Sequence, residues 1–143
     1  MPVTYQIDAA RKLIHTTCSP PLTFTEVIEH FRTLRQDPAC TGRLDVLLDV
    51  SDADTLPESR QFGPIAAELS AVRAKTEFGV CAIIATRDAM FGMMRVFEVA
   101  VSPYFRAIRV FRGPSRPGSG WTANEPARIL HASLSPSQVR LAP

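Results

Sequence analysis

The sequence predicts an α/β fold, a mixed β-sheet of four to five strands with helices packed against it, followed by an irregular C-terminal tail. Two observations predict this fold. Segments with strand and helix patterns alternate after an opening pair of strands, in the order β-β-α-β-α-β-α-β, which favours a sheet with helical crossovers. The composition is also that of a globular domain, since 45% of the 143 residues are apolar and 21% are charged. We therefore expect one domain over residues 1–112 and a tail over residues 113–143.

The chain opens with two short segments rich in β-forming residues, 3–8 and 12–18, which predict an antiparallel hairpin. Residues 23–36 then carry apolar side chains at intervals of three and four, as one face of a helix does. Thr23 and Glu26 form a T-x-x-E capping box, in which each side chain binds a free N–H of the first turn. A helix is therefore expected from this box onward.

Residues 44–50 (LDVLLDV) alternate between apolar and mixed positions and predict the next strand. The helix that follows has an ambiguous start, because Gly63-Pro64 interrupts its apolar spacing. The residue before a proline disfavours the α conformation, and proline suits the first helical turn. We expect a regular helix from about Pro64 to Lys75 after an irregular turn; the alternative is a helix that begins near Glu58 and kinks.

Residues 78–85 (FGVCAIIA) are continuously apolar, which predicts a central strand covered on both faces. A long helix over residues 89–101 and a last strand over residues 107–111 complete the domain. The tail contains five of the twelve prolines and three of the seven glycines, with a short helical pattern only at residues 124–132 and Trp121 as the natural anchor. The tail either lies over the surface or grips a partner or a second copy of the chain.

Charge and composition limit the function. A net charge of +2 without any block of Lys or Arg gives no support for binding nucleic acid. No apolar run is long enough to span a membrane, and the first residues lack the pattern of a signal peptide. The three cysteines are far apart and form no C-x-x-C, which favours a reduced, cytoplasmic protein.

No catalytic motif is found. G-x-S-x-G, G-x-G-x-x-G and the P-loop pattern are absent from the sequence. The three histidines are distant from one another, and His30 is expected on the polar side of the first helix. We therefore expect no catalytic residue, no cofactor and no metal ligand.

An acidic segment, Asp49, Asp52 and Asp54, follows the strand at 44–50. DADTL is similar to the D-x-D-x-T signature of haloacid-dehalogenase-type phosphotransferases, but the threonine comes one residue early and no second acidic pair completes a metal site. Oxygen ligands would also suit a simple Mg²⁺ site. The favoured interpretation is that these acids keep a turn in water and cap the next helix.

The helix at 89–101 has one ordinary core face and one unusual outer face. The core face is expected to contain Met90, Met93, Met94, Phe97, Ala100 and Val101. The other side is too apolar for a fully hydrated surface and contains Phe91, Gly92, Arg95, Val96, Glu98 and Val99. Three interpretations remain: cover by the tail, an interface with a partner or a second copy, or the wall of an apolar pocket made pliable by methionine.

Three stretches, residues 5–34, 43–56 and 78–111, resemble the SpoIIAA-like group of STAS domains. The motifs LLDVSD and FGMMRVFE lie within them. STAS domains of this group are small bacterial proteins related to SEC14-type lipid-binding folds. The resemblance implies a sheet of four or five strands backed by helices, acting in protein interaction or ligand sensing. In the anti-sigma antagonists a serine at a helix start is phosphorylated, and Ser59 stands at the comparable position. Here the Asp and Gly of that turn are missing, since the segment reads Pro57-Glu58-Ser59-Arg60.

The leading hypothesis is a cytoplasmic, non-enzymatic STAS-like module that binds a protein partner and forms a homodimer. Its interaction loop would consist of Asp49, Ser51, Asp52, Asp54 and Ser59. Its interface or pocket helix would use Met90, Phe91, Met94, Arg95, Phe97, Glu98 and Val99. The alternative is a carrier or sensor of a small apolar, lipid-like ligand, which a dry cavity of a few hundred Å³ would favour.

Overall fold

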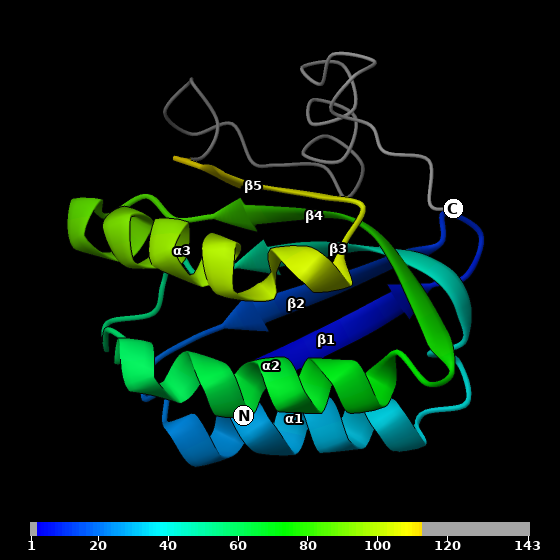
Figure 1. The fold of residues 1–143 in the computed structure, drawn as a ribbon. Coiled ribbons are helices and arrows are strands. Elements are labelled where there is room, and N and C mark those ends of the chain that lie inside the picture. The colour runs from blue at the N-terminus through cyan, green and yellow to red at the C-terminus, as the bar shows by residue number, and fades with distance from the viewer. Residues whose placement is uncertain (1–2, 113–143) are drawn as a thin grey trace.

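All three helices of the described chain lie on one face of a five-stranded β-sheet (Figure 1). The structure is a computed structural model, and it describes residues 3–112. The strands are β1 (Val3–Asp8), β2 (Leu13–Cys18), β3 (Gly42–Asp49), β4 (Thr76–Ile84) and β5 (Ala107–Phe111). The helices are α1 (Phe24–Gln36), α2 (Phe62–Val72) and α3 (Asp88–Val101), with two short 3₁₀ turns, η1 (Ser59–Gln61) and η2 (Ser102–Tyr104).

The strands follow one another across the sheet in the order in which they occur in the chain. β1 is antiparallel to β2, and the pairs β2–β3, β3–β4 and β4–β5 are parallel. A helix crosses over between each pair of parallel strands, and crossovers of one hand between successive neighbours place every helix on the same side. The expected mixed sheet of four to five strands with helices packed against it is confirmed.

The two faces of the sheet contribute to two separate apolar clusters. Alternate residues of a strand point to opposite faces, so Val46 and Leu48 face the helices while Leu47 faces away from them. The main core lies between the sheet and the helices. The smaller cluster on the other face consists of Leu13, Leu47, Val80, Ala82 and Ile84. β4 is buried on both faces, as its continuous apolar run predicts.

The first half of the chain follows its local signals. The hairpin turns with Lys12 at a positive φ of 54°, so a non-glycine residue adopts the left-handed conformation there. Thr23 caps α1, and its Oγ1 accepts a hydrogen bond of 3.3 Å from the backbone N–H of Glu26. The helix therefore begins where the sequence predicts.

The expected bounds of the second helix are wrong. α2 begins at Phe62 and ends at Val72, and not at Pro64 and Lys75. The 3₁₀ turn η1 runs directly into it, and Gln61 Oε1 accepts a hydrogen bond of 3.0 Å from the N–H of Glu58. Pro64 lies in the first turn of α2, where its missing N–H would have had no partner within the helix, so no kink is needed.

α3 begins one residue earlier than expected, at Asp88, and differs at one position of its core face. Met90, Met94, Phe97 and Val101 are buried as expected, but Ala100 is exposed. Met93, seven residues before Ala100, lies on the same edge of the helix and is only half-buried. The covered stripe of α3 is thus narrower than the sequence pattern predicts.

Two further expectations concern the ends of the chain and the membrane. The predicted tail at 113–143, with Trp121 and the short helical pattern, lies outside the described residues. In the described part, no helix combines the length and the apolar character needed to cross a bilayer.

Candidate functional site: an apolar cavity between sheet and helices

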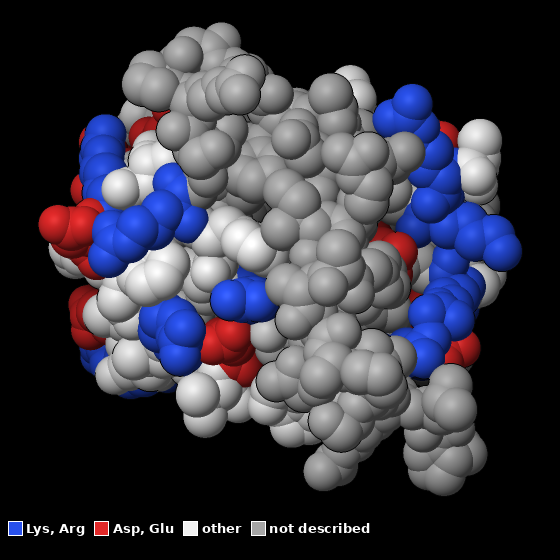
Figure 2. Space-filling model, turned by 90° about the horizontal axis from the view of Figure 1, so that it is seen from above, with Lys and Arg blue, Asp and Glu red and all other residues white. Residues whose placement is uncertain are grey.

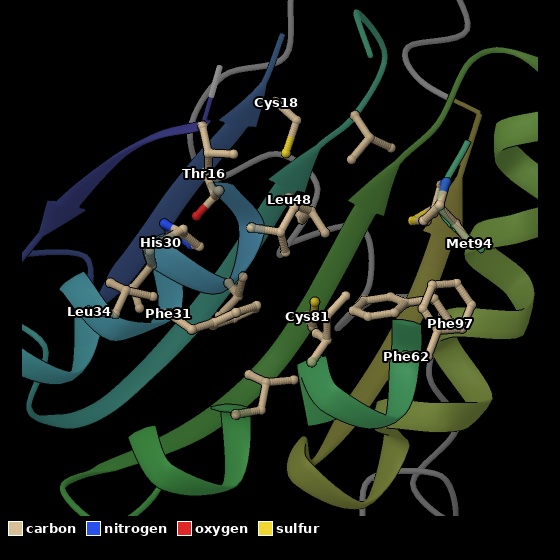
Figure 3. Close-up of a pocket in the computed structure, with 18 of the residues that line it drawn as sticks. Thr16, Cys18, His30, Phe31, Leu34, Leu48, Phe62, Cys81, Met94 and Phe97 are labelled. Atoms are coloured by element: carbon tan, nitrogen blue, oxygen red, sulfur yellow. The ribbon is translucent and has the colours of Figure 1, made fainter. Parts of the chain in front are cut away.

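A cavity of about 120 Å³ lies between the helix-bearing face of the sheet and the three helices (Figure 3). Its wall is almost entirely apolar. Strands contribute from one side and helices from the other, and the side chains that define it include Thr16, Cys18, His30, Phe31, Leu34, Leu48, Phe62, Cys81, Met94 and Phe97.

The periodicities of strand and helix place these side chains. Thr16 and Cys18 are two residues apart on β2 and therefore point to the same face of the sheet. Met90, Met94 and Phe97 recur at spacings of four and three on α3 and so lie on one stripe of the helix. The sequence expectation that this methionine-rich stripe faces inward is confirmed for these three residues.

Aromatic rings and methionines of α2 and α3 form one part of the cavity wall. The rings of Phe62 and Phe97 contact each other edge to face, with centroids 5.2 Å apart. Met90 and Met94 line the same part. Because methionine is unbranched and flexible, this part of the wall can adapt its shape more easily than a wall of branched side chains.

His30 is the unexpected member of the wall. It was predicted on the polar side of the first helix, but its ring lines the cavity and packs against Tyr5 at 5.3 Å and Phe31 at 5.2 Å between centroids. Burial lowers the pKa of His30 to about 4, so the imidazole is neutral at pH 7. His30 lies three residues after Val27 and four before Leu34, and this spacing could have placed it on the apolar stripe.

The two thiols of the wall are protonated. Burial, and to a smaller extent the nearby carboxylate of Asp49, raises the pKa of Cys18 to about 12. Burial likewise raises the pKa of Cys81 far above its ordinary range. Since the thiolate is the reactive form of cysteine, both residues act here as small apolar groups.

The cavity extends toward the carboxyl ends of the parallel strands. Leu22, in the loop after β2, and Pro57, in the loop after β3, contribute to its wall. Both side chains are partly exposed, unlike the fully buried Cys81 at its centre. The carboxyl edge of an open α/β sheet is also where such folds commonly bind ligands.

The aspartates of the predicted interaction loop do not converge. Asp49 Oδ1 accepts hydrogen bonds from both the backbone N–H, at 3.0 Å, and the hydroxyl of Ser51. Asp54 Oδ1 accepts a bond of 3.2 Å from the hydroxyl of Thr55, and Asp52 is exposed. In residues 3–112, no group of three or more His, Cys, Asp or Glu side chains is arranged to hold a metal ion.

The rest of the predicted interaction loop is accessible. Ser59 is exposed and is the first residue of the 3₁₀ turn η1. Beside it, the guanidinium of Arg60 donates to the carboxylate of Glu58. Arg87 Nη1 donates a bond of 3.3 Å to the carbonyl of Ala53, which ties the loop to the start of α3.

The outer side of α3 is partly apolar, as predicted, but not uniformly available. Val99 is 74% exposed and Val96 is 48% exposed. Arg95 forms an ion pair of 3.4 Å with Glu98 across one turn of the helix. Phe91 is half-buried, and the guanidinium of Arg112 lies 4.3 Å above its ring. The two valines are therefore the accessible apolar part of this side.

On the face shown in Figure 2, charged side chains of one sign do not gather into a single patch. Basic side chains gather toward two sides of this face, and acidic side chains lie among them. Charges of opposite sign at short distance partly cancel, so the field over the visible surface is weakened. The visible surface therefore adds no charged site to the cavity as a candidate.

Comparison of the chain with protein-family models, with curated proteins and with solved structures gives no match.

Proposed function

We propose that the chain is a small STAS-like binding module, cytoplasmic and non-enzymatic, that takes a small apolar ligand into the cavity between its sheet and helices. The single observation that carries this proposal is the cavity of about 120 Å³ with an almost entirely apolar wall. Protein interiors are normally close-packed, with few voids larger than a water molecule. An apolar space of this size between sheet and helices is therefore unusual and favours an occupant.

The volume sets the size of the ligand. An engineered apolar cavity of about 150 Å³ binds benzene or xenon, and the present cavity is slightly smaller. Its volume thus corresponds to a ligand no larger than about one aromatic ring or a short branched hydrocarbon. This is below the few hundred Å³ that would hold a whole lipid, so we propose a single-ring or short-chain ligand in place of a lipid molecule.

Native mass spectrometry of the freshly purified protein, together with thermal unfolding in the presence of toluene, tests the proposal. We expect retained small-molecule mass, or a melting temperature that rises with toluene concentration, because a ligand that binds only the folded state stabilises it. The same toluene series on Val99→Asp, which alters only the exposed side of α3, serves as a control and should give the same shift. An unchanged melting temperature up to the solubility limit of toluene, with no retained mass, would contradict the proposal.

A second candidate function is self-association through the outer side of α3, which the exposure of Val96 and Val99 favours. The interaction loop is tied to the start of this helix through Arg87, so loop and helix offer neighbouring surfaces to a second copy or another protein. Sedimentation velocity of the wild type and of Val99→Asp tests it. We expect a dimer that the charged substitution weakens; a monomer at all accessible concentrations would end this candidate.

A further inference from the structure

The centre of the sheet is buried on the face that has no helix. All three helices of the described chain, and the cavity beneath them, lie on the opposite face (Figure 1). On the helix-free face, Leu47 of β3 and Ala82 of β4 are each only 1% exposed. They belong to the smaller apolar cluster, here named the outer cluster, together with Leu13, Val80 and Ile84.

The burial on this face is local. Thr4 and Gln6 of β1 point to the same face as the outer cluster, because Tyr5, which lies between them, packs against the main core. Both Thr4 and Gln6 are exposed. Parallel strands are found almost only in sheets that are covered on both faces. The contrast indicates a cover over the parallel strands β3 and β4 that does not reach β1.

The described chain ends beside the outer cluster. Ala107 and Phe111 of the edge strand β5 pack against it, and the tail, residues 113–143, follows one residue later. Neighbouring strands are about 4.8 Å apart, so β3 is about 10 Å from β5 across the sheet. An extended chain advances about 3.3 Å with each residue. The first few residues of the tail are therefore enough to reach the centre of the cluster.

The composition of the tail suits a cover. A segment that stays in water is typically rich in charge and poor in large apolar residues. Only four of the 31 tail residues are charged, namely Arg116, Glu125, Arg128 and Arg140. The large apolar residues of the tail are Trp121, Ile129, Leu130, Leu134, Val139 and Leu141. The tail thus supplies apolar side chains that contact with the outer cluster would remove from water.

We propose that the tail docks on the outer cluster and forms a second layer over the helix-free face of the sheet, with Trp121 as its anchor. The occupant belongs to the same chain, because Leu47 and Ala82 are already buried in a single copy of the protein. Trp121 comes nine residues after Arg112, and an extended chain of this length spans about 30 Å, so the indole can reach every part of the cluster. This docking surface is separate from the cavity and goes beyond the proposed function.

Fluorescence of the 143-residue chain tests the proposal, because Trp121 is its only tryptophan. In the wild type we expect emission at shorter wavelength, and weaker quenching by acrylamide, than in the urea-unfolded chain. Ala82→Glu places a charge at the centre of the outer cluster, where a docked tail would have to bury it. Both readings should move to the values of the unfolded chain, while far-UV circular dichroism shows that the helices remain.

Two control variants carry a new charge elsewhere. Val99→Asp alters the exposed side of α3, the other apolar surface available to the tail, and Gln6→Glu alters the exposed part of the helix-free face. Neither should change the emission of Trp121. If Ala82→Glu does not fold, Ala107→Glu decides the question, because this position is only half-buried on the edge strand β5 and should still shift the emission in the same direction.

The proposal is overturned by any of four results. Emission and quenching of the native wild type could equal those of the unfolded chain. The two variants in the outer cluster could fold and leave the emission of Trp121 unchanged. A shift in Val99→Asp alone would place the tail on α3. Shielding of Trp121 that disappears on dilution, together with dissociation of a dimer in sedimentation velocity, would identify a second copy as the occupant.

Discussion

At the scale of single residues, the partly buried imidazole of His30 couples the core of the protein to pH. Its pKa is about 4 in the folded protein, against an ordinary value of 6.5, because burial disfavours the charged ring. Between these two values the unfolded chain binds more protons than the folded one. The free energy of unfolding therefore rises with pH through this window and is fully developed above pH 6.5.

We predict that the wild type loses up to about 3 kcal/mol of stability when the pH falls from 6.5 to 4, given about 1.4 kcal/mol for each unit of pKa shift. Urea unfolding at half-unit steps of pH measures this loss. His30→Leu should lose markedly less over the same window. Asp37, whose hydrogen bond from Tyr5 keeps the pKa of its carboxyl below the ordinary range, adds a loss of stability near pH 4, but both proteins share this loss and it cancels in the comparison. Equal slopes for both proteins would mean that His30 is accessible to water.

The role of single residues was only partly predictable from the sequence. Met90, Met94 and Phe97 were placed correctly, because apolar residues at helical spacing have one favourable side to face. His30 was misplaced, because histidine has intermediate polarity and its neighbours along the chain, Glu29 and Phe31, differ in character. What decides its position is the contact with Tyr5 from β1, a segment distant in sequence.

At the scale of elements, the pairing of β3 with β4 depends on one side chain and one glycine. The register shifts by one residue between Leu44 and Val46, so Asp45 stands opposite both Gly79 and Val80. Asp45 Oδ1 accepts a hydrogen bond of 2.9 Å from the backbone N–H of Val80. A Cβ on Gly79 would collide with this same carboxylate oxygen. The bulge therefore requires a glycine beside the aspartate.

We predict that Gly79→Ala lowers the free energy of unfolding by about 1–3 kcal/mol, because the displaced carboxylate leaves the buried N–H of Val80 without its partner. Chemical denaturation measures the effect. Gly92→Ala in α3 is the matched control: its added Cβ meets nothing within 4 Å, so it should stabilise the helix by about 0.5–1 kcal/mol.

A double-mutant cycle separates the collision from a general effect of alanine at position 79. In the background of Asp45→Ala the obstructing carboxylate is gone, and we expect Gly79→Ala to be nearly neutral there. If Gly79→Ala were equally destabilising with and without Asp45, the collision would not be the cause.

The elements themselves were predictable where the chain carries a complete local signal. The apolar run of β4, the capped start of α1 and the strand β5 follow directly from composition, spacing and a capping residue. The start of α2 was not predictable, because Gly63-Pro64 is compatible with a helix that begins before or at the proline. The contact of α2 with its preceding 3₁₀ turn decides between them, and that contact depends on the whole loop after β3.

At the scale of the whole molecule, the cavity makes the free energy of unfolding lower than a close-packed core would give. With about 24 cal/mol for each Å³ of cavity, a volume of 120 Å³ corresponds to roughly 3 kcal/mol. Domains of this size are stable by only about 5–15 kcal/mol, so the loss is a substantial fraction of the total. The cavity could not be predicted from the sequence, because its volume depends on how side chains from distant elements fit together.

We predict that filling this space with protein atoms stabilises the fold and removes the ligand site at the same time. Cys81 is suited to the change, because it is buried on the interior strand β4 and lines the cavity. Cys81→Ile adds two heavy atoms in a shape that strands favour, and burial of the additional carbon should raise the free energy of unfolding by about 1 kcal/mol.

The same variant should lose the toluene-dependent rise of the melting temperature, because protein and ligand would compete for one space. Cys81→Ser is the matched control: it leaves the volume open, so it should keep the toluene response while losing stability through a buried hydroxyl. A variant that is more stable and still responds to toluene would place the ligand elsewhere in the molecule. If Cys81→Ile were destabilised instead, the surrounding side chains could not rearrange to hold the larger residue, and the cavity would accept only ligands that fit its present shape.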